Sequence, residues 1–332
     1  MRIGIVGAGK FGLALAKIAA GKDNQVLLYS RRIDEVNSIN NDGKSLSGVV
    51  FPSNEKTSAT STTKDLDNCD VLLITVPSKD FRSTIESLDI DIQTTKIVSC
   101  VKGFEEKTGK LMSEILKDDF SMAENNIFIL SGPNLSKEIS DKELTGTVIA
   151  GSDKDFINQL SESMSNNYFI PFSSSDRYGV EMGGAMKNIY AIISGYFHEK
   201  GVGENTIGLL LTKSLEEISL YSHARGANAS TFLGLSGVGD FFSTALSVHS
   251  RNYQFGKFLA MDKGSAEALE MVNDTVEGFL TSKIVHSDAK KRGLDLKILN
   301  FLIELYENPK SLDEAKEIFH TDCIEEDSKF NF

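Results

Sequence analysis

The sequence of 332 residues is poor in cysteine and contains no long apolar run. Its three cysteines, Cys69, Cys100 and Cys323, are odd in number and lack the spacing of metal ligands. This pattern favours reduced thiols, and we expect neither a disulfide framework nor a bound metal. No segment has the ~20 consecutive apolar residues of a membrane-spanning helix, and the first apolar strand begins at Ile3, which leaves no room for a signal peptide. We therefore expect a cytoplasmic protein that does not insert into membranes.

Positive charge is also scarce. The chain has 35 Lys and Arg residues against 47 Asp and Glu residues, a formal net charge of −12. Nucleic-acid binding depends on neutralising phosphates with basic side chains, so this balance predicts that nucleic acid is not a partner. Any small anion must instead be bound by local basic residues and backbone N–H groups. The length and the 40% hydrophobic content are sufficient for two domains, each with its own core.

The first residues of the chain contain the pattern G-x-G-x-x-G between an apolar strand and an apolar helix. Arg2–Val6 is the strand, Gly7, Gly9 and Gly12 are the glycines, and Gly21 ends the helix. The first glycine permits a tight turn, the second allows a pyrophosphate to approach the backbone, and the third allows close packing of helix and strand. A Gly-rich turn without a ligand is the alternative. The strand–turn–helix order favours a bound dinucleotide, with its phosphates at the helix N-terminus.

The end of the second apolar strand, Gln25–Ser30, indicates which dinucleotide is bound. An NAD-specific site usually has an acidic residue near this point to bind the ribose hydroxyls. Here Arg31 and Arg32 follow the strand, and Asp34 and Glu35 come only afterwards. Guanidinium groups suit bidentate contacts with a 2′-phosphate, which favours NADPH. NADH remains possible if the two arginines are merely solvated loop residues.

Strands and helices alternate over the first ~170 residues, and this order predicts an α/β fold with a doubly wound (Rossmann-like), mostly parallel sheet. Further strands are expected at 71–76, 96–99, 127–130, 147–150 and 168–171, and a long polar loop at 41–63 with at most one short strand. Ligands bind at the carboxyl ends of the strands in such sheets. Residues expected along that rim are Lys10, Arg31, Pro77, Lys102 and Asn134.

Beyond residue 176 the pattern becomes purely helical. Helices are expected over 180–197, with an interruption of the apolar pattern at Gly183 and Gly184, and over 207–221, 279–291 and 298–307. We therefore predict two domains: residues 1–175 bind the dinucleotide, and residues 176–332 form a C-terminal all-α domain that binds substrate and carries the catalytic residues.

Three features of the second half are candidates for chemistry. Lys187 lies in an otherwise apolar and small-residue helix, where a lysine with a lowered pKa could exchange a proton with a substrate oxygen. Asp240 follows three closely spaced glycines. Ser250–Asn252 is a dense group of side chains that can donate hydrogen bonds to a phosphate. Each has a simpler interpretation: a lysine on a solvated helix face, an aspartate that caps a helix, and a surface turn. The five histidines lack metal spacing, and we assign them no role.

Together these motifs give the chain a specific resemblance. The stretches are GAGKFGLALA at 7–16, VKGFE at 101–105, LSGPNLSKE at 130–138, VEMGGAMKNIYAI at 180–192, TFLGLSGVGDFFST at 231–244, SRN at 250–252 and VEG at 276–278. In this order the chain resembles the bacterial NAD(P)-dependent glycerol-3-phosphate dehydrogenases. The resemblance implies reduction of dihydroxyacetone phosphate, a small phosphate substrate, to sn-glycerol 3-phosphate with NADPH or NADH. The product of that family feeds phospholipid biosynthesis.

The resemblance also implies roles for individual residues. Lys187 is the expected proton donor and acceptor, with Lys102 and Asp240 as the other catalytic residues. The expected substrate-binding residues are Lys102, Gly132, Asn134, Lys187, Asp240, Ser250, Arg251 and Asn252. The expected cofactor-binding residues are Gly7, Gly9, Lys10, Phe11, Gly12, Arg31, Arg32, Lys102, Ser136, Arg251, Thr275 and Glu277.

Two other functions are compatible with part of the pattern. A two-domain dehydrogenase acting on a hydroxy acid such as pantoate would share the first domain, but would not need the Ser250–Asn252 cluster as a phosphate site. A non-catalytic NADPH sensor would not need Lys102, Lys187 and Asp240 together. A helical second domain could also pair across a two-fold axis to form a homodimer.

Overall fold

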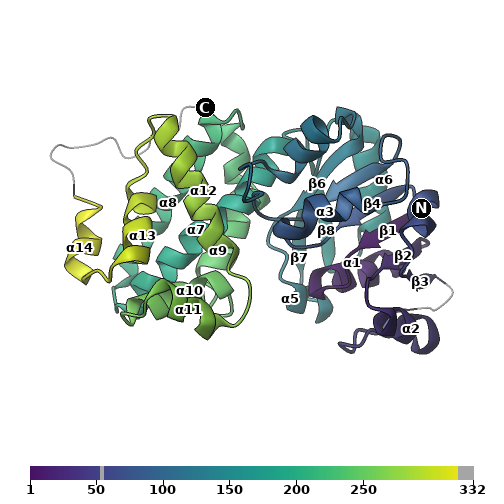
Figure 1. The fold of residues 1–332 in the computed structure, drawn as a ribbon, viewed down its shortest axis with the longest axis horizontal. Coiled ribbons are helices and arrows are strands. Elements are labelled where there is room, and N and C mark those ends of the chain that lie inside the picture. Colours follow the sequence, from purple (N-terminus) through teal and green to yellow (C-terminus); the bar gives the residue numbers. More distant parts are fainter. Residues whose placement is uncertain (53–55, 321–332) are drawn as a thin grey trace. The chain divides into compact units, whose positions relative to one another are not determined.

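The computed structural model describes residues 1–52 and 56–320, which form two compact units (Figure 1). Unit 1 comprises Met1–Glu105 and Lys110–Val180, and unit 2 comprises Glu106–Gly109 and Glu181–Phe332. Each unit is described by itself below. Among the described residues, no helix combines the length and the apolar character needed to cross a membrane.

Unit 1 is built on an eight-stranded sheet in the order β3-β2-β1-β4-β5-β6-β7-β8. The strands are β1 (Arg2–Val6), β2 (Gln25–Tyr29), β3 (Thr57–Thr60), β4 (Val71–Ile74), β5 (Lys96–Ser99), β6 (Ile127–Ser131), β7 (Thr145–Ala150) and β8 (Phe169–Ser174). All neighbouring pairs are parallel except β6 and β7, which are antiparallel. The mostly parallel, doubly wound sheet expected from the sequence is confirmed.

Two hydrophobic cores cover the two faces of this sheet, and β4 contributes to both. Val71 and Leu73 belong to one core, and Leu72 and Ile74 belong to the other. This explains why the strand is an unbroken apolar run, because alternate side chains of a central parallel strand are buried on opposite faces. Helices α1 (Lys10–Ala20), α2 (Ile33–Asp42) and α6 (Lys154–Met164) contribute to the first core. Helices α3 (Phe81–Glu86) and α4 (Met112–Glu114) contribute to the second.

Short elements complete unit 1. They are the 3₁₀ turns η1 (Thr63–Asn68), η2 (Ser78–Asp80) and η4 (Glu124–Asn126), the π turn η3 (Ile115–Asp119), and helix α5 (Ser136–Ser140). The polar stretch at 41–63 contains the single short strand β3, as expected, over the part that the structure describes. Helix α2 was not expected, because its sequence is mostly polar and it buries only Glu35, Val36 and Ile39. Cys69 and Cys100 are free and buried, as expected, whereas Cys323 lies outside the described residues.

The regular elements in the described part of unit 2 are all helices. Its longer helices are α7 (Arg177–Glu199, which starts in unit 1), α8 (Glu204–Ala224), α10 (Arg251–Ala260), α11 (Ser265–Val272), α12 (Glu277–Lys291) and α13 (Lys297–Glu307). The shorter ones are η5 (Ala229–Leu233), the π turn η6 (Leu235–Gly239), α9 (Asp240–Ala245) and α14 (Leu312–Glu317). The helical second half predicted from the sequence is thus confirmed for residues 176–320.

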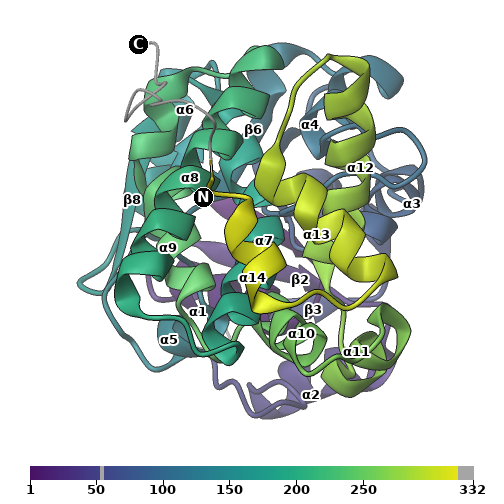
Figure 2. The ribbon, with the colours of Figure 1, turned by 90° about the vertical axis from the view of Figure 1, so that its left-hand side faces the viewer.

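Helix α7 is the central element of unit 2 (Figure 2). Its residues from Val180 to Phe197 are buried. Gly183 does not interrupt the helix, although the apolar pattern changes there. A Cβ at this position would collide with the backbone carbonyl of Ser236, so glycine is required by close packing. Gly256 of α10 meets the Ile192 carbonyl of α7 in the same way. These close approaches fix the backbone of α7.

Candidate active site

The Gly-rich turn between β1 and α1 has the geometry of a phosphate-binding turn. Gly7 has a φ of +118°, a conformation that favours glycine, and its carbonyl accepts a 3.0 Å hydrogen bond from Oγ1 of Thr75. A Cβ on Gly12 would collide with the same Gly7 carbonyl, whereas a Cβ on Gly9 would have nothing within 4 Å. The backbone is therefore packed tightly at the outer glycines and is accessible at the middle one.

The start of α1 fits an anionic group. The helix begins at Lys10 after the N-cap Gly9, which provides no side-chain cap, and its first turn has no acidic residue. The first N–H groups of a helix have no intrahelical partner, and they carry a partial positive charge. Lys10 is exposed and Phe11 is half-buried. These features match the requirements of a dinucleotide pyrophosphate.

The two arginines after β2 differ in their surroundings. The guanidinium of Arg32 forms a 2.8 Å ion pair with Glu35, whose side chain is only 1% exposed. Arg31 is exposed, and no polar partner is found for it among the described residues. Both arginines follow the carboxyl end of β2. Of the two, Arg31 has the guanidinium that is available to the 2′-phosphate of NADPH.

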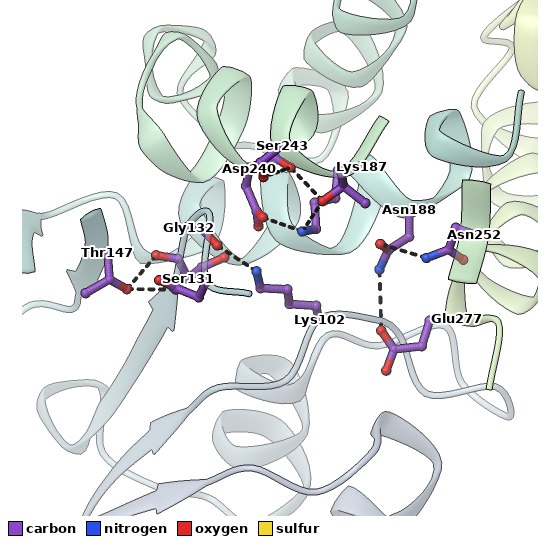
Figure 3. Close-up of polar contacts among 12 residues, drawn as sticks. Lys102, Ser131, Gly132, Thr147, Lys187, Asn188, Asp240, Ser243, Asn252 and Glu277 are labelled. Carbon is purple, nitrogen blue, oxygen red and sulfur yellow. Dashed lines mark hydrogen bonds and ion pairs between the residues drawn. The ribbon is translucent and has the colours of Figure 1, made fainter. Parts of the chain in front are cut away.

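A second polar group of unit 1 lies at the carboxyl ends of β5 and β6. Nζ of Lys102 donates a 2.7 Å hydrogen bond to the carbonyl of Gly132, which has a φ of +134° (Figure 3). Nδ2 of Asn134 donates to Oγ1 of Thr147 at 2.9 Å, and that hydroxyl donates to the Ser131 carbonyl at 3.1 Å. Oγ of Ser131 and Oδ1 of Asn134 are buried without a hydrogen-bond partner among the described residues. Buried polar atoms of this kind are candidates for ligand contacts.

In unit 2, Lys187 is at the centre of a buried polar cluster. The residue is 6% exposed, so the interpretation as a solvated lysine is wrong. Its ammonium forms an ion pair with Asp240 and donates a 2.7 Å hydrogen bond to Oγ1 of Thr244 (Figure 3). Asp240 is 1% exposed and is the first residue of α9, one position after the N-cap Gly239, so it is not a capping residue. The Thr244 hydroxyl in turn donates to the Asp240 backbone carbonyl at 2.8 Å.

A neighbouring amide network joins α7, α10 and α12. Nδ2 of Asn252 donates a 3.0 Å hydrogen bond to Oδ1 of Asn188, and Oδ1 of Asn252 accepts one of 2.9 Å from the N–H of Gly278. Nδ2 of Asn188 faces Glu277 at 3.4 Å (Figure 3). Asn252 is 8% exposed and belongs to a buried network, so the interpretation of its segment as a surface turn is wrong for this residue.

The remaining expected residues lie at the starts of helices or on the exposed surface. Ser250 is the N-cap of α10, and its hydroxyl accepts from the N–H of Tyr253. Arg251 is half-exposed and forms a 2.7 Å ion pair with Asp274, and Thr275 is exposed beside it. Ser136 begins α5 in unit 1.

Sequence reasoning missed several residues that hold the polar groups of the two units in place. Thr75 is held against the Gly-rich turn by its position after β4, and Thr147 supports Asn134 from an antiparallel strand. Thr244 lies one helical turn beyond Asp240, so an i, i+4 search from that aspartate would have found it. Asn188 directly follows Lys187, but nothing in the sequence indicates its link to Asn252.

The fold and site together define a two-unit NAD(P)-binding oxidoreductase. Two family models cover almost the whole chain: NAD-dependent glycerol-3-phosphate dehydrogenase N-terminus over residues 2–157 and the corresponding C-terminus over residues 176–317. The chain belongs to the NAD-dependent glycerol-3-phosphate dehydrogenase family. It is an enzyme that uses NAD(P)H to reduce dihydroxyacetone phosphate to glycerol 3-phosphate.

Individual relatives agree with this assignment. The chain is 37% identical over 293 residues to a glycerol-3-phosphate dehydrogenase [NAD(P)+] of Ectopseudomonas mendocina, covering 87% of this chain and 85% of the relative. It is 37% identical over 313 residues to the protein of the same name from Alcanivorax borkumensis, covering 93% and 90%. The crystal structure of glycerol-3-phosphate dehydrogenase from Coxiella burnetii superposes with a TM-score of 0.83 at 27% identity, covering 96% of this chain and 97% of that one.

Proposed function

We propose that Lys187 is the proton donor of the reaction, on the observation that its buried ammonium is held by Asp240 and Thr244. When bound, the reduced nicotinamide supplies the hydride. Negative charge then develops on the carbonyl oxygen of the substrate, and the ammonium of Lys187 transfers a proton to that oxygen. Asp240 and Thr244 keep Nζ at a fixed position, which matters because general acid catalysis contributes about 10²–10⁴ in rate only when the donor is well placed.

Lys102 is the second catalytic residue of this proposal, and its role is to supply positive potential to the substrate. Its Nζ is oriented by the carbonyl of Gly132, so the charge is fixed at the carboxyl ends of the strands. A preorganised donor of this type is worth about 10²–10³ in rate. Gly132 and Asn134 line the substrate site of unit 1, and the buried Oδ1 of Asn134 is available to a substrate hydroxyl.

The start of α10 is the proposed binding site for the substrate phosphate. Arg251 carries a half-exposed guanidinium whose partner Asp274 is also half-exposed, so a phosphate can compete for it. Ser250 and Asn252 flank it and complete the substrate site. The N-terminus of this ten-residue helix adds a partial positive charge.

The residues proposed to hold the cofactor come from the Gly-rich turn, from the two arginines after β2 and from the polar groups described above. They are Gly7, Gly9, Lys10, Phe11, Gly12, Arg31, Arg32, Lys102, Ser136, Arg251, Thr275 and Glu277. The exposed guanidinium of Arg31 supports a preference for NADPH over NADH.

We further propose that residues 1–175 act as the dinucleotide-binding domain and residues 176–332 as the substrate-binding and catalytic domain. The remaining proposals are that the enzyme works in the cytoplasm, that it forms a homodimer, and that its product supplies glycerophospholipid synthesis.

A substrate comparison tests this function. Purified protein is mixed with NADPH or NADH and either dihydroxyacetone phosphate or 2-dehydropantoate, and the absorbance of the reduced nicotinamide is followed. Rapid oxidation with dihydroxyacetone phosphate alone, faster with NADPH, supports the proposal. Oxidation with the keto acid alone supports the hydroxy-acid alternative, and cofactor binding without oxidation supports a sensor.

A further inference from the structure

Two buried residues that the proposed chemistry does not use, Tyr190 and Glu217, are linked to the segments that carry Lys187 and Asp240. Tyr190 is on α7, one helical turn beyond Lys187, and is 0% exposed. Its ring packs edge-on against Phe241, the residue after Asp240, with ring centroids 6.4 Å apart and planes at 80°. Tyr190 is therefore connected to Lys187 through one turn of α7 and to Asp240 through its ring contact with the neighbouring Phe241.

The hydroxyl of Tyr190 is fixed by Glu217 of α8. It donates a 3.0 Å hydrogen bond to Oε2 of this carboxylate. Glu217 is 8% exposed, and it also accepts hydrogen bonds from the N–H groups of Ile298 at 2.7 Å and Leu299 at 3.2 Å, in the first turn of α13. One carboxylate thus links α7, α8 and α13, and a buried acid with three donors is held rigidly.

We propose that Tyr190 and Glu217 are positioning residues for the reaction: they set the distance and direction between Lys187 on α7 and Asp240 on α9. This inference rests on the catalytic role proposed for Lys187. The tether on its hydroxyl keeps the ring of Tyr190 against Phe241. Without it the ring can rotate, and Phe241 can shift α9 relative to α7. A misplacement of about 1 Å at a catalytic group can cost ~10² in rate, so a small repacking is enough to matter.

The test is a set of conservative variants. Tyr190→Phe keeps the ring and removes only the hydroxyl, and Glu217→Leu removes the acceptor. We expect each to lower kcat about tenfold while KM for NADPH stays within about twofold, because neither residue is among those proposed to hold the cofactor. The double variant should lose no more than either single one, because both break the same link. Glu217→Gln, whose amide can still contact the Tyr190 hydroxyl and one N–H of α13, should recover most of kcat.

Tyr306→Phe is the matched control. Its hydroxyl is also buried, 3.1 Å from Oγ of Ser282, and its ring packs against Phe255 and Phe279 rather than near Asp240. We expect a similar loss of Tm but an unchanged kcat. Equal losses of kcat in Tyr190→Phe and Tyr306→Phe would overturn the proposal, because general softening would explain both.

Lys187→Met separates this inference from the function it rests on. If Lys187→Met is inactive and Tyr190→Phe has the kcat of the wild type, positioning by Tyr190 is wrong and the role of Lys187 stands. If Lys187→Met turns over at the normal rate, the role of Lys187 is wrong, and the inference fails with it.

Discussion

The ammonium of Lys187 and the carboxylate of Asp240 form an ion pair although they are 53 residues apart in the chain, and both side chains are almost completely buried. Burial removes water from both charges, which is costly unless the charges are paired and hydrogen-bonded. Thr244 provides the additional hydrogen bond to Lys187. An arrangement this costly to bury is typical of a functional centre.

The first prediction concerns this pair. Asp240→Asn removes the charge and retains the shape, so the ammonium of Lys187 stays buried without a counter-ion. We expect the free energy of unfolding to fall by about 3 kcal/mol and kcat to fall about 10²-fold. Chemical denaturation and steady-state kinetics measure the two effects. Ser243→Ala is the control, because its hydroxyl donates a hydrogen bond to the backbone carbonyl of Asp240 and not to its carboxylate, and it should change neither strongly. Wild-type kcat in Asp240→Asn would contradict the assigned role.

The second prediction distinguishes the two arginines after β2. Arg31 is exposed and available, whereas Arg32 is engaged with the buried Glu35. Arg31→Ala should weaken NADPH binding about tenfold and leave NADH nearly unchanged, because a charged hydrogen bond contributes about 1.5–3 kcal/mol. Arg32→Ala should have a smaller selective effect and should destabilise the protein, since it leaves Glu35 buried without its partner. Titration of each variant with both cofactors measures this. Equal losses for NADPH and NADH would show that these side chains do not contact the 2′-phosphate.

The third prediction is a pH dependence of stability that originates at Glu217. Burial raises the pKa of Glu217 from its ordinary 4.5 to about 7, and the N–H groups of α13 and the Tyr190 hydroxyl only partly offset this. Asp295 raises the pKa further. Between pH 4.5 and 7 the folded protein binds more protons at this group than the unfolded chain does. Its contribution to stability is therefore full at low pH and is lost as pH rises towards 7, by roughly 3 kcal/mol.

Glu217→Gln removes this titration. Its free energy of unfolding, compared with that of the wild type by urea denaturation, should improve steadily as pH rises from 4.5 to 7 and then remain constant. A difference between the two proteins that does not change with pH would mean that the Glu217 carboxyl has an ordinary pKa in the folded protein.

The fourth prediction tests the close packing around α7. Gly256→Ala places a methyl group against the Ile192 carbonyl, and because backbone cannot yield, we expect a loss of about 2 kcal/mol in the free energy of unfolding. Gly208→Ala on α8 is the matched control: nothing lies within 4 Å of its added Cβ, and alanine favours helix. It should stabilise unit 2 by about 0.5–1 kcal/mol. If both substitutions had the same effect, close packing against α7 would not be the cause.

Local patterns predicted most of the fold. The apolar runs of β1, β2, β4, β5 and β6 are long enough to identify buried strands, and the glycines around α1 identify its start and end. Helix α2 escaped notice because most of its residues are polar and only three of them are buried, so it lacks an apolar run. The antiparallel direction of β7 also could not be derived, because strand direction depends on the path of the connecting chain.

The sequence indicates candidate site residues one by one, but not the contacts among them. The composition of the helix around Lys187 suggested a buried lysine, and its burial is confirmed. Its partner could not be found in the same way, because the contact with Asp240 depends on how α9 packs against α7 and not on sequence spacing. Glu217 gave no signal at all: in the sequence it is one of several acidic residues on α8, and only tertiary packing buries it at the start of α13.

The most direct test is the rate at which Lys187→Met and Lys187→Arg oxidise NADPH in the presence of dihydroxyacetone phosphate, relative to the wild type. Binding of NADPH is measured in parallel by fluorescence to show that the fold is intact. We predict that both variants bind NADPH normally and that kcat falls by about 10²–10⁴, because neither methionine nor an arginine that stays protonated can exchange the proton. Turnover close to that of the wild type in either variant would show that Lys187 is not the proton donor.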